Sequence, residues 1–315
     1  MSTCIICDSD SFRTGKRFYD DRYGYPGEFG LMACSVCGHK YLDHNFTPEA
    51  LKDIYTSYYP RSSFSLEQFR TRKEAKGFSA WLNGSRRSAY CWVPPKVRVL
   101  DIGCGFGESL AYHAARGCDA YGVEVDENIK RVAEKFGFKV HVGPFAPNVY
   151  SPDFFDYVTM DQVLEHVVDP VETLLGVEQI LRPGGKVIIS TPNANGWGAH
   201  FFGRRWINWH APYHLHHFSV QSMGFAAEKA GLAVEQVRTI TMSEWLLYQW
   251  IHVVLFPKPG EPSAFWALER SKADLDKIWI KAMTLIHHLK INHLITRMFD
   301  QLGVGDNRLF VLIKK

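Results

Sequence analysis

The chain has 315 residues, a length that corresponds to about two domains. Hydrophobic residues make up 46% of it and charged residues 22%, which excludes a disordered chain, a collagen-like chain and a disulfide-stapled mini-protein. The 36 basic and 33 acidic residues give a formal net charge of +3, without the basic excess that is typical of a dedicated nucleic-acid binder. We therefore expect no nucleic-acid partner.

The sequence pattern shows no targeting signal. The first ten residues, MSTCIICDSD, lack a basic segment followed by an apolar run. No stretch approaches the roughly 18 apolar residues of a membrane-spanning helix. Seven cysteines without an export signal favour a reducing compartment, and a metal-binding or catalytic use of those cysteines. We expect a cytoplasmic protein.

Residues 1–45 carry two cysteine pairs, Cys4 with Cys7 and Cys34 with Cys37. Two such C-x-x-C pairs match the four thiolates of a tetrahedral structural zinc. A site with four protein ligands has no open coordination position, so we expect this zinc to stabilise a segment too small to build its own core. The sequence thus predicts a zinc-ribbon-like module over residues 1–45.

Residues 46–95 are predicted to form a helical lid or linker. Thr47 followed by a proline is a typical helix start, and Pro60 ends that helix. A second helix is expected over Leu66–Leu82, before a boundary at Pro94. This segment is locally basic, which suits either the binding of a diphosphate group or a solvated surface.

From residue 97 onward, short apolar strands alternate with helices, which predicts βαβ units and a parallel sheet. The expected strands cover Val97–Ile102, Ala120–Val125, Lys139–Val142, Asp156–Met160, Lys186–Thr191, Leu232–Thr239 and Arg308–Ile313. The expected helices cover Glu108–Arg116, Glu127–Phe136, Pro170–Leu181 and Ser219–Ala230. We assign residues 96–242 and 303–315 to this α/β core, and residues 243–302 to a mostly helical insertion before the last strand.

The first of these strands ends in a glycine loop, DIGCGFG, over residues 101–107. Its G-x-G-x-G spacing differs from the G-x-G-x-x-G of a dinucleotide site. Asp101 lies two residues before the first glycine, where a carboxylate repels a pyrophosphate but attracts an ammonium group. Glu124 ends the next strand, and a carboxylate there accepts hydrogen bonds from ribose hydroxyls. Together these features predict S-adenosylmethionine as the cofactor.

With the later motifs QVLEHV and LRPGGKVIISTPN, the sequence resembles the class I S-adenosylmethionine-dependent methyltransferases over about residues 97–242 and the last strand. The resemblance implies a Rossmann-like sheet of seven strands in which the final strand is antiparallel. It also implies a cofactor site. In that site Asp101 anchors the methionine end, the glycine loop passes beneath the cofactor, and Glu124 binds the ribose. The residues assigned to the site are Asp101, Gly103, Cys104, Gly105, Gly107, Glu124, Val125, Phe145 beside the adenine, Asp161, Gln162, and Tyr58 at the start of a lid.

Four polar residues follow the fourth expected strand: Asp161, Gln162, Glu165 and His166. Because strand ends at this edge face the ligand crevice, we expect these groups to converge beside the sulfonium of the cofactor. The stretch looks like the ubiquinone-type O-methyltransferases, some of which hold a divalent cation with an E-x-x-E-H cluster. Here Gln162 takes the first position, so we expect no catalytic divalent metal. Alternatively, Glu165 and His166 only orient the next helix.

Four histidines lie between residues 210 and 217, and His214 begins the pattern H-L-x-x-F-S, which is common in small-molecule methyltransferases. Histidine titrates near neutrality, so His214 or His166 is a candidate base that removes a proton from an acceptor hydroxyl. The alternative is a packing role for His214. A zinc site built from the four histidines is disfavoured by their cramped H-x-H-H spacing.

The insertion at 243–302 opens with an aromatic and aliphatic run, Trp245–Phe256. Four interpretations of such a patch stay open. It covers a hydrophobic pocket, it lies on the inner face of a membrane, it forms a homodimer contact, or it belongs to a plain core helix. Further on, Leu275 and Ile278 begin a repeat at helical spacing. With seven bases and six acids in the insertion, electrostatic attachment to a membrane is expected to be weak.

The leading hypothesis is therefore methyl transfer from S-adenosylmethionine to a small molecule, with O-methylation favoured. The first expectation for the acceptor is a sugar or nucleotide-sugar. A lipid or quinone-like acceptor is the alternative that the apolar patch suggests. Methylation of RNA is a second enzymatic alternative. A non-catalytic, zinc-dependent interaction protein is a third reading, which the intact glycine loop disfavours.

Overall fold

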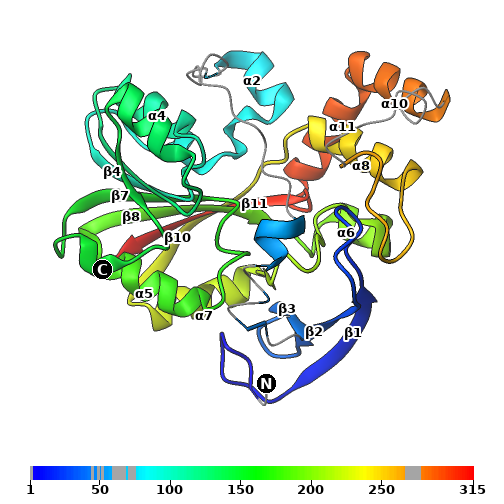
Figure 1. Ribbon diagram of the computed structural model, residues 1–315, viewed down its shortest axis with the longest axis horizontal. Coiled ribbons are helices and arrows are strands. Elements are labelled where there is room, and N and C mark those ends of the chain that lie inside the picture. Colours follow the sequence, from blue (N-terminus) through cyan, green and yellow to red (C-terminus); the bar gives the residue numbers. More distant parts are fainter. Residues whose placement is uncertain are drawn as a thin grey trace.

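The computed structural model describes residues 3–43, 46–47, 50, 53–58, 69, 76–266 and 278–315. The predicted helix break at Pro60 and the start of the repeat at Leu275 lie outside these residues, as does most of the helix predicted over 66–82. Within the described part, the chain forms an α/β core, a small cysteine-bearing sheet and a helical insertion (Figure 1).

The core sheet has seven strands in the order β10-β11-β8-β7-β4-β5-β6. The strands are β4 (Arg98–Ile102), β5 (Asp119–Glu124), β6 (Lys139–Val142), β7 (Phe155–Asp161), β8 (Leu181–Pro192), β10 (Leu232–Thr239) and β11 (Asn307–Lys314). Only β11 runs antiparallel to its neighbours, β8 and β10. This confirms the predicted Rossmann-like sheet, and it places the carboxyl ends of β4, β5, β6, β7 and β8 at one edge.

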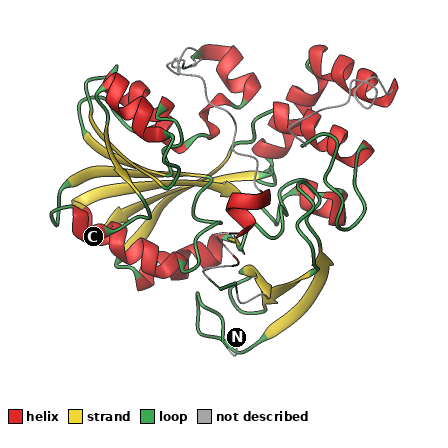
Figure 2. Cartoon of the chain, in the orientation of Figure 1, coloured by secondary structure: helices red, strands yellow, loops and turns green. Residues whose placement is uncertain are grey.

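Helices cover both faces of the sheet (Figure 2). They are α3 (Glu108–Ala114), α4 (Ile129–Phe136), α5 (Pro170–Ile180) and α7 (Val220–Lys229). The side chain of Asp169 caps α5 by accepting hydrogen bonds from two backbone amides, and Ser219 caps α7 in a capping box with Ser222. Such caps satisfy amides that have no partner within the helix, which explains why these helices start where they do.

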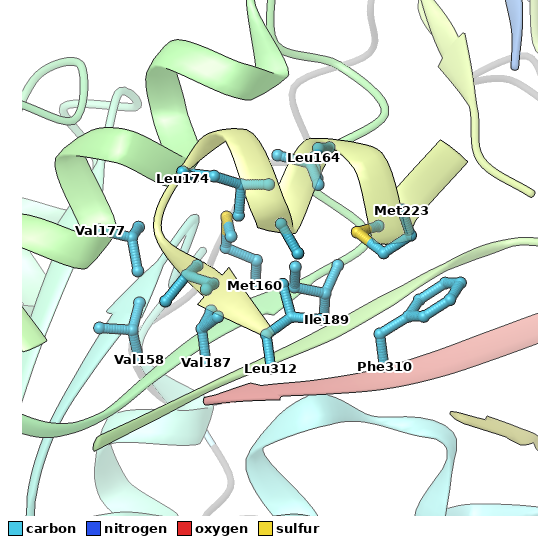
Figure 3. Packing of buried hydrophobic residues seen from close by; sticks show 14 of the residues in the cluster. Val158, Met160, Leu164, Leu174, Val177, Val187, Ile189, Met223, Phe310 and Leu312 are labelled. Atoms are coloured by element: carbon cyan, nitrogen blue, oxygen red, sulfur yellow. The ribbon is translucent and has the colours of Figure 1, made fainter. Parts of the chain in front are cut away.

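The main core lies between the sheet and the two helices α5 and α7 (Figure 3). Alternate residues of the strands meet side chains of the helices there, all of them buried: Val158, Met160, Leu164, Leu174, Val177, Val187, Ile189, Met223, Phe310 and Leu312. Each such side chain stabilises the fold by about 1.5–3 kcal/mol relative to an exposed position. The packing holds the carboxyl edge of the sheet in place.

The cysteine-bearing module is built on a second sheet, of order β1-β2-β3-β9. Its strands are β1 (Phe12–Phe18), β2 (Phe29–Cys34), β3 (Lys40–Asp43) and β9 (His216–His217). The last of these belongs to the core half of the chain, and it pairs with β3 through Lys40 with His217 and Tyr41 with His216. The module is therefore joined by backbone pairing to the segment that follows His214.

The remaining elements are the helical insertion and several short helical turns (Figure 1). The insertion between β10 and β11 contributes α8 (Glu244–Val254), α10 (Ile278–His288) and α11 (Ile291–Gln301). Shorter helical turns are η1 (Ile54–Tyr58), α2 (Gly77–Asn83), η2 (Ser85–Arg87), η3 (Ala89–Trp92), η4 (Pro147–Val149), α6 (Trp197–Phe201) and η5 (Gly203–Arg205). None of the helices in the described part of the chain has the length and apolarity needed to cross a membrane.

Candidate active site

The glycine loop follows β4 at the carboxyl edge of the sheet. Gly103 and Gly105 have φ angles of 73° and 55°, in the left-handed region that favours glycine. A Cβ atom on Gly103 would lie only 2.5 Å from the Val163 side chain, whereas one on Gly105 would meet no atom within 4 Å. The loop is thus packed against the protein at Gly103 and open above Gly105, where a ligand can approach the backbone.

Asp101 lies at the base of this loop and is buried. Its carboxylate accepts a hydrogen bond from the hydroxyl of Ser109 on α3 and another, of 2.5 Å, from the hydroxyl of Thr159 on β7. The carboxylate therefore ties the loop to a helix and to the neighbouring strand. Its predicted part in anchoring the methionine end of a cofactor stays a prediction.

Glu124 faces the glycine loop from the end of β5. One of its carboxylate oxygens accepts a hydrogen bond from the Gly105 amide (2.8 Å), and the other accepts one from the Asp126 amide (2.9 Å). The next residue, Val125, is exposed. This arrangement puts a carboxylate at the rim of the open loop, in the position where ribose binding is predicted.

Three other predicted cofactor residues lie around the same edge. Cys104 is buried, and burial raises the pKa of its thiol, so it is unsuited to act as a nucleophile. Phe145 follows β6, and its ring packs close to Gly176 of α5. Tyr58 contacts Tyr25 edge to face at 5.0 Å, so it lies against the cysteine-bearing module.

The end of β7 separates the two polar residues that were predicted to act together. Gln162 donates hydrogen bonds of 2.9 Å to Ser190 on β8 and to Asn307 on β11, which fixes its amide on the sheet. One buried carboxylate oxygen of Asp161 has no hydrogen-bond partner in the described part of the chain. Asp161 thus retains an acceptor for a ligand, and Gln162 has a structural partner instead.

Glu165, His166 and His214 converge, as their candidate ligand atoms all lie within 4.8 Å of one another. The two imidazole rings meet edge to face, with 4.7 Å between their centroids. Nδ1 of His166 donates to the Tyr213 carbonyl (2.9 Å), and Nδ1 of His214 donates to the Asn208 carbonyl (2.9 Å). These bonds fix the tautomer in which each Nε2 is an acceptor.

Burial determines the charge states in this cluster. It lowers the pKa of His166 to about 4 and shifts the pKa of His214 well below its usual value, so both rings are neutral bases near pH 7. Glu165 is fully buried, and within the described residues neither of its carboxylate oxygens has a hydrogen-bond partner. Burial raises the pKa of this carboxyl to about 8. The Thr191 hydroxyl and the backbone amide of Glu165 itself offset part of this rise in pKa. A carboxyl buried so deeply is still costly, which is typical of a functional site.

The cluster has the donor set of a divalent-cation site, two imidazole nitrogens and one carboxylate. The sequence analysis weighed a metal at the residues near Gln162 and, separately, at the four histidines, but it did not combine His214 with Glu165 and His166. The run of histidines at 210–217 was the available signal, but it gave no sign of which ring meets Glu165. His216 lies elsewhere, with its Nδ1 3.1 Å from Nε2 of His39. No metal group containing all four histidines occurs among the described residues.

The four N-terminal cysteines form the second metal-ligand set, with all four sulfurs within 4.8 Å of one another. The sulfur–sulfur distances are 3.7 Å between Cys4 and Cys37 and 3.5 Å between Cys7 and Cys34. A tetrahedral zinc with Zn–S bonds of about 2.3 Å separates its sulfurs by about 3.8 Å. The cluster therefore fits the predicted structural zinc.

The module also reaches the histidine cluster through the loop between β1 and β2, which sequence reasoning missed. The hydroxyl of Tyr213 donates to Asp20 (3.3 Å), and the ring of Tyr23 lies 5.3 Å from that of Tyr213. From η1, the Tyr55 hydroxyl lies 3.2 Å from Nδ1 of His166. The tyrosines at 19, 23 and 25 were the signal in the sequence. Of these, Tyr23 places its ring beside those of His210 and Tyr213, next to the cluster.

A seven-stranded sheet with one antiparallel strand, and a glycine loop facing a carboxylate, define the class I methyltransferase fold. A family model described as a methyltransferase domain matches residues 57–237, and the chain belongs to this family. This confirms the resemblance seen in the sequence.

Among relatives, the chain is 38% identical over 105 residues to a ubiquinone biosynthesis O-methyltransferase of Aromatoleum aromaticum. That match covers 31% of this chain and 45% of the relative, so the chain spans less than half of that protein's length. It is 30% identical over 157 residues to the Pseudomonas aeruginosa protein of the same name, covering 46% of this chain and 68% of the relative. Phosphoethanolamine N-methyltransferase 2 of Haemonchus contortus, solved with S-adenosyl-L-methionine, superposes with a TM-score of 0.51 at 18% identity, over 87% of this chain and 62% of that one. The superposition shows a shared fold.

Proposed function

We propose that the protein transfers a methyl group from S-adenosylmethionine to an oxygen of a small-molecule acceptor. The observation that carries this proposal is the position of the Glu165, His166 and His214 cluster at the same sheet edge as the open glycine loop. The loop fits the cofactor because it exposes backbone above Gly105 and has a carboxylate, Glu124, at its rim. When bound, the cofactor supplies an electrophilic methyl group on its sulfonium.

The residues of this chain position and deprotonate the acceptor. Nε2 of His214 accepts the proton of the acceptor hydroxyl, because its ring is neutral and its Nδ1 proton is held by the Asn208 carbonyl. His166 stands beside it in the same tautomer. Burial of the cluster excludes water, which strengthens each electrostatic contact there. Without water, the oxygen of the acceptor is the nucleophile that meets the methyl group.

For the acceptor, we now place a quinone-like or phenolic ring ahead of the sugar that the sequence first suggested. Two things support this order. The relatives are O-methyltransferases of ubiquinone biosynthesis by name, and the tyrosines Tyr23, Tyr55 and Tyr213 surround the approach to His166. Flat rings stack on such side chains. A phenolic hydroxyl also loses its proton to an imidazole more readily than an alcohol does.

A divalent cation held by Glu165, His166 and His214 is a second mode for the same reaction, and the three-donor geometry favours it. Such a cation lowers the pKa of a bound hydroxyl. Addition of a chelator that removes divalent cations but leaves the cysteine-bound zinc distinguishes the two modes. Turnover that survives chelation and is not raised by Mg²⁺ or Mn²⁺ supports His214 as a direct base.

The first test is calorimetric titration with S-adenosylmethionine and S-adenosylhomocysteine, with zinc quantified on the same sample. We expect binding of both ligands and about one zinc per chain. Binding by neither would contradict the proposal and favour a non-catalytic interaction protein. Strong, salt-dependent binding of RNA, together with methylation of RNA, would instead support the RNA alternative.

A further inference from the structure

Helix α11 of the insertion has its polarity inverted. Its buried side chains are polar: Asn292, His293, Thr296 and Arg297. Its exposed side chains are mostly apolar: Ile291, Leu294, Met298 and the following Leu302, with Leu294 58% and Leu302 67% exposed. A surface helix of a water-soluble protein shows the opposite arrangement, with its apolar stripe facing the core. An apolar partner is therefore missing from the outer face of α11.

The inversion is fixed by hydrogen bonds. Arg297 donates to the carbonyls of Trp81 on α2 (2.8 Å) and of Thr241, and it pairs with Asp300 at 2.8 Å. The hydroxyl of Thr296 bonds to that of Ser243, at 2.9 Å, at the start of α8. Rotating α11 to bury its leucines would leave these buried polar groups unpaired, at a cost of about 1–3 kcal/mol each. The outer face of α11 therefore stays apolar.

Helix α10 extends the same surface. Ile278 and Trp279 at its start and Leu285 and Leu289 near its end are all exposed. Beside them, a cavity of about 390 Å³ opens between α8, α10 and α11, lined by apolar side chains that include Trp250, Val253, Met283, Ile286 and Ile295. Figure 1 shows α10 and α11 at the end of the molecule away from the cysteine-bearing sheet. We call residues 278–302 of this hairpin the apolar face.

Charge identifies the kind of partner. Residues 278–302 contain one acid, Asp300, which pairs with Arg297, and they carry Lys281, Lys290 and three histidines besides. Lys281 and Lys290 are exposed beside the apolar stripe. In the described part of the chain, Glu244 of α8 lies close enough to the half-buried His287 to act on its charge. Exposed lysines are depleted from protein–protein interface cores, whereas apolar side chains flanked by lysine are typical of helices that lie in a bilayer interface.

We propose that the apolar face docks on an anionic lipid bilayer, with the leucines of α10 and α11 inserted and Lys281 and Lys290 at the headgroups. The insertion is joined to the segment that leads to His214, because Gln249 of α8 accepts from the Ile207 amide (2.8 Å) and donates to the Arg205 carbonyl (2.7 Å). This inference does not depend on the methyl-transfer reaction.

The test is flotation of the full-length protein with vesicles of phosphatidylcholine alone or mixed with phosphatidylglycerol. We expect binding to the anionic vesicles, weaker binding to the neutral ones, and a decrease with salt. The double variant Leu294→Glu, Met298→Glu is expected to bind the anionic vesicles at least about tenfold more weakly, because two inserted side chains are replaced by carboxylates.

The matched control is the double variant Leu175→Glu, Val149→Glu, in which two residues of comparable exposure, 42% and 49%, lie outside the hairpin. It should bind vesicles as the unmodified protein does. Circular dichroism and the urea midpoint, measured on every variant, show that each is folded. No flotation with anionic vesicles overturns the proposal. So does a dimer by light scattering that the hairpin variant alone loses, since a second copy would then cover the face.

Discussion

The two halves of the sheet edge differ in how their polar groups are satisfied. Around the glycine loop, the carboxylates are bound within the protein: Asp101 to Ser109 and Thr159, and Glu124 to the amides of Gly105 and Asp126. In the histidine cluster, Glu165 is buried with both oxygens unpartnered among the described residues. The polar groups of the glycine-loop half are hydrogen-bonded within the protein. The histidine half contains buried polar groups that a ligand or a metal ion can bind.

The two halves also differ in how they are assembled. The glycine loop and its partners come from three adjacent strands of one sheet, β4, β5 and β7, and from α3. The histidine half joins the end of β7, the 206–217 segment, η1 and the cysteine-bearing module, which pairs with it through β3 and β9. A defect in the module should therefore damage the acceptor side before the cofactor side. The predictions below test that separation.

The largest effect is expected for His214→Ala. Loss of a general base lowers turnover by roughly 10²–10⁴-fold, while the affinity for S-adenosylmethionine stays unchanged because the glycine loop is untouched. Steady-state kinetics with a phenolic acceptor and calorimetry measure the two quantities. His200→Ala is the matched control, since its Nδ1 also bonds to a backbone carbonyl (2.7 Å) but on exposed α6. Equal turnover in the two variants would remove His214 from the mechanism.

The next effect is expected for Cys37→Ser. Loss of a zinc ligand removes folding energy from the module, and Ser219 loses the fixed carbonyl of Cys37 to which it donates at 2.7 Å. We expect zinc loss, a fall of about 3 kcal/mol or more in the free energy of unfolding, and a larger loss of turnover than of cofactor affinity. Urea denaturation and metal analysis check this, with Cys118→Ser as control. Full turnover without zinc would show that the halves are not coupled through the module.

The third prediction concerns pH. Burial lowers the pKa of nine histidines below the usual 6.5: His39, His113, His166, His210, His214, His216, His217, His287 and His293. Their contribution to stability is complete above about pH 6.5 and is lost as pH falls toward the folded-state values, because only the unfolded chain takes up the protons. Each histidine costs up to about 1 kcal/mol between about pH 7 and 5.5. Urea midpoints that stay constant over this range would contradict the buried neutral state.

The smallest effect is expected for Glu124→Gln, which keeps the side-chain shape and removes its charge. If the carboxylate binds the ribose hydroxyls, the dissociation constant for S-adenosylmethionine rises about tenfold. Turnover at saturating cofactor stays close to that of the unmodified protein, since the histidine cluster is intact. Glu127→Gln serves as control, because Glu127 pairs with Lys130 (3.3 Å) at the surface. An unchanged dissociation constant would show that the Glu124 carboxylate does not bind the ribose and that its role is to hold the Gly105 amide.

Much of the fold could be predicted from short stretches of sequence. The strand expected over Lys139–Val142 has those same bounds in β6, and the last strand matches β11 to within a residue at each end. These elements are encoded by local periodicity and by turn residues, which act over a few neighbours. The zinc ligands were equally readable, because each C-x-x-C pair is contiguous.

The sequence by itself thus determined the sheet, the glycine loop and its acidic partner, and the cysteine set. Only the tertiary structure decided that His214, rather than Gln162, meets Glu165 and His166, that Asp20 contacts Tyr213 across 193 residues, and that α11 faces outward with its leucines. The physical reason is range. Backbone preferences and contiguous motifs are local. The acceptor side and the orientation of α11 depend instead on buried hydrogen bonds between segments far apart in the chain, and the periodicity of the sequence does not predict which residues form them.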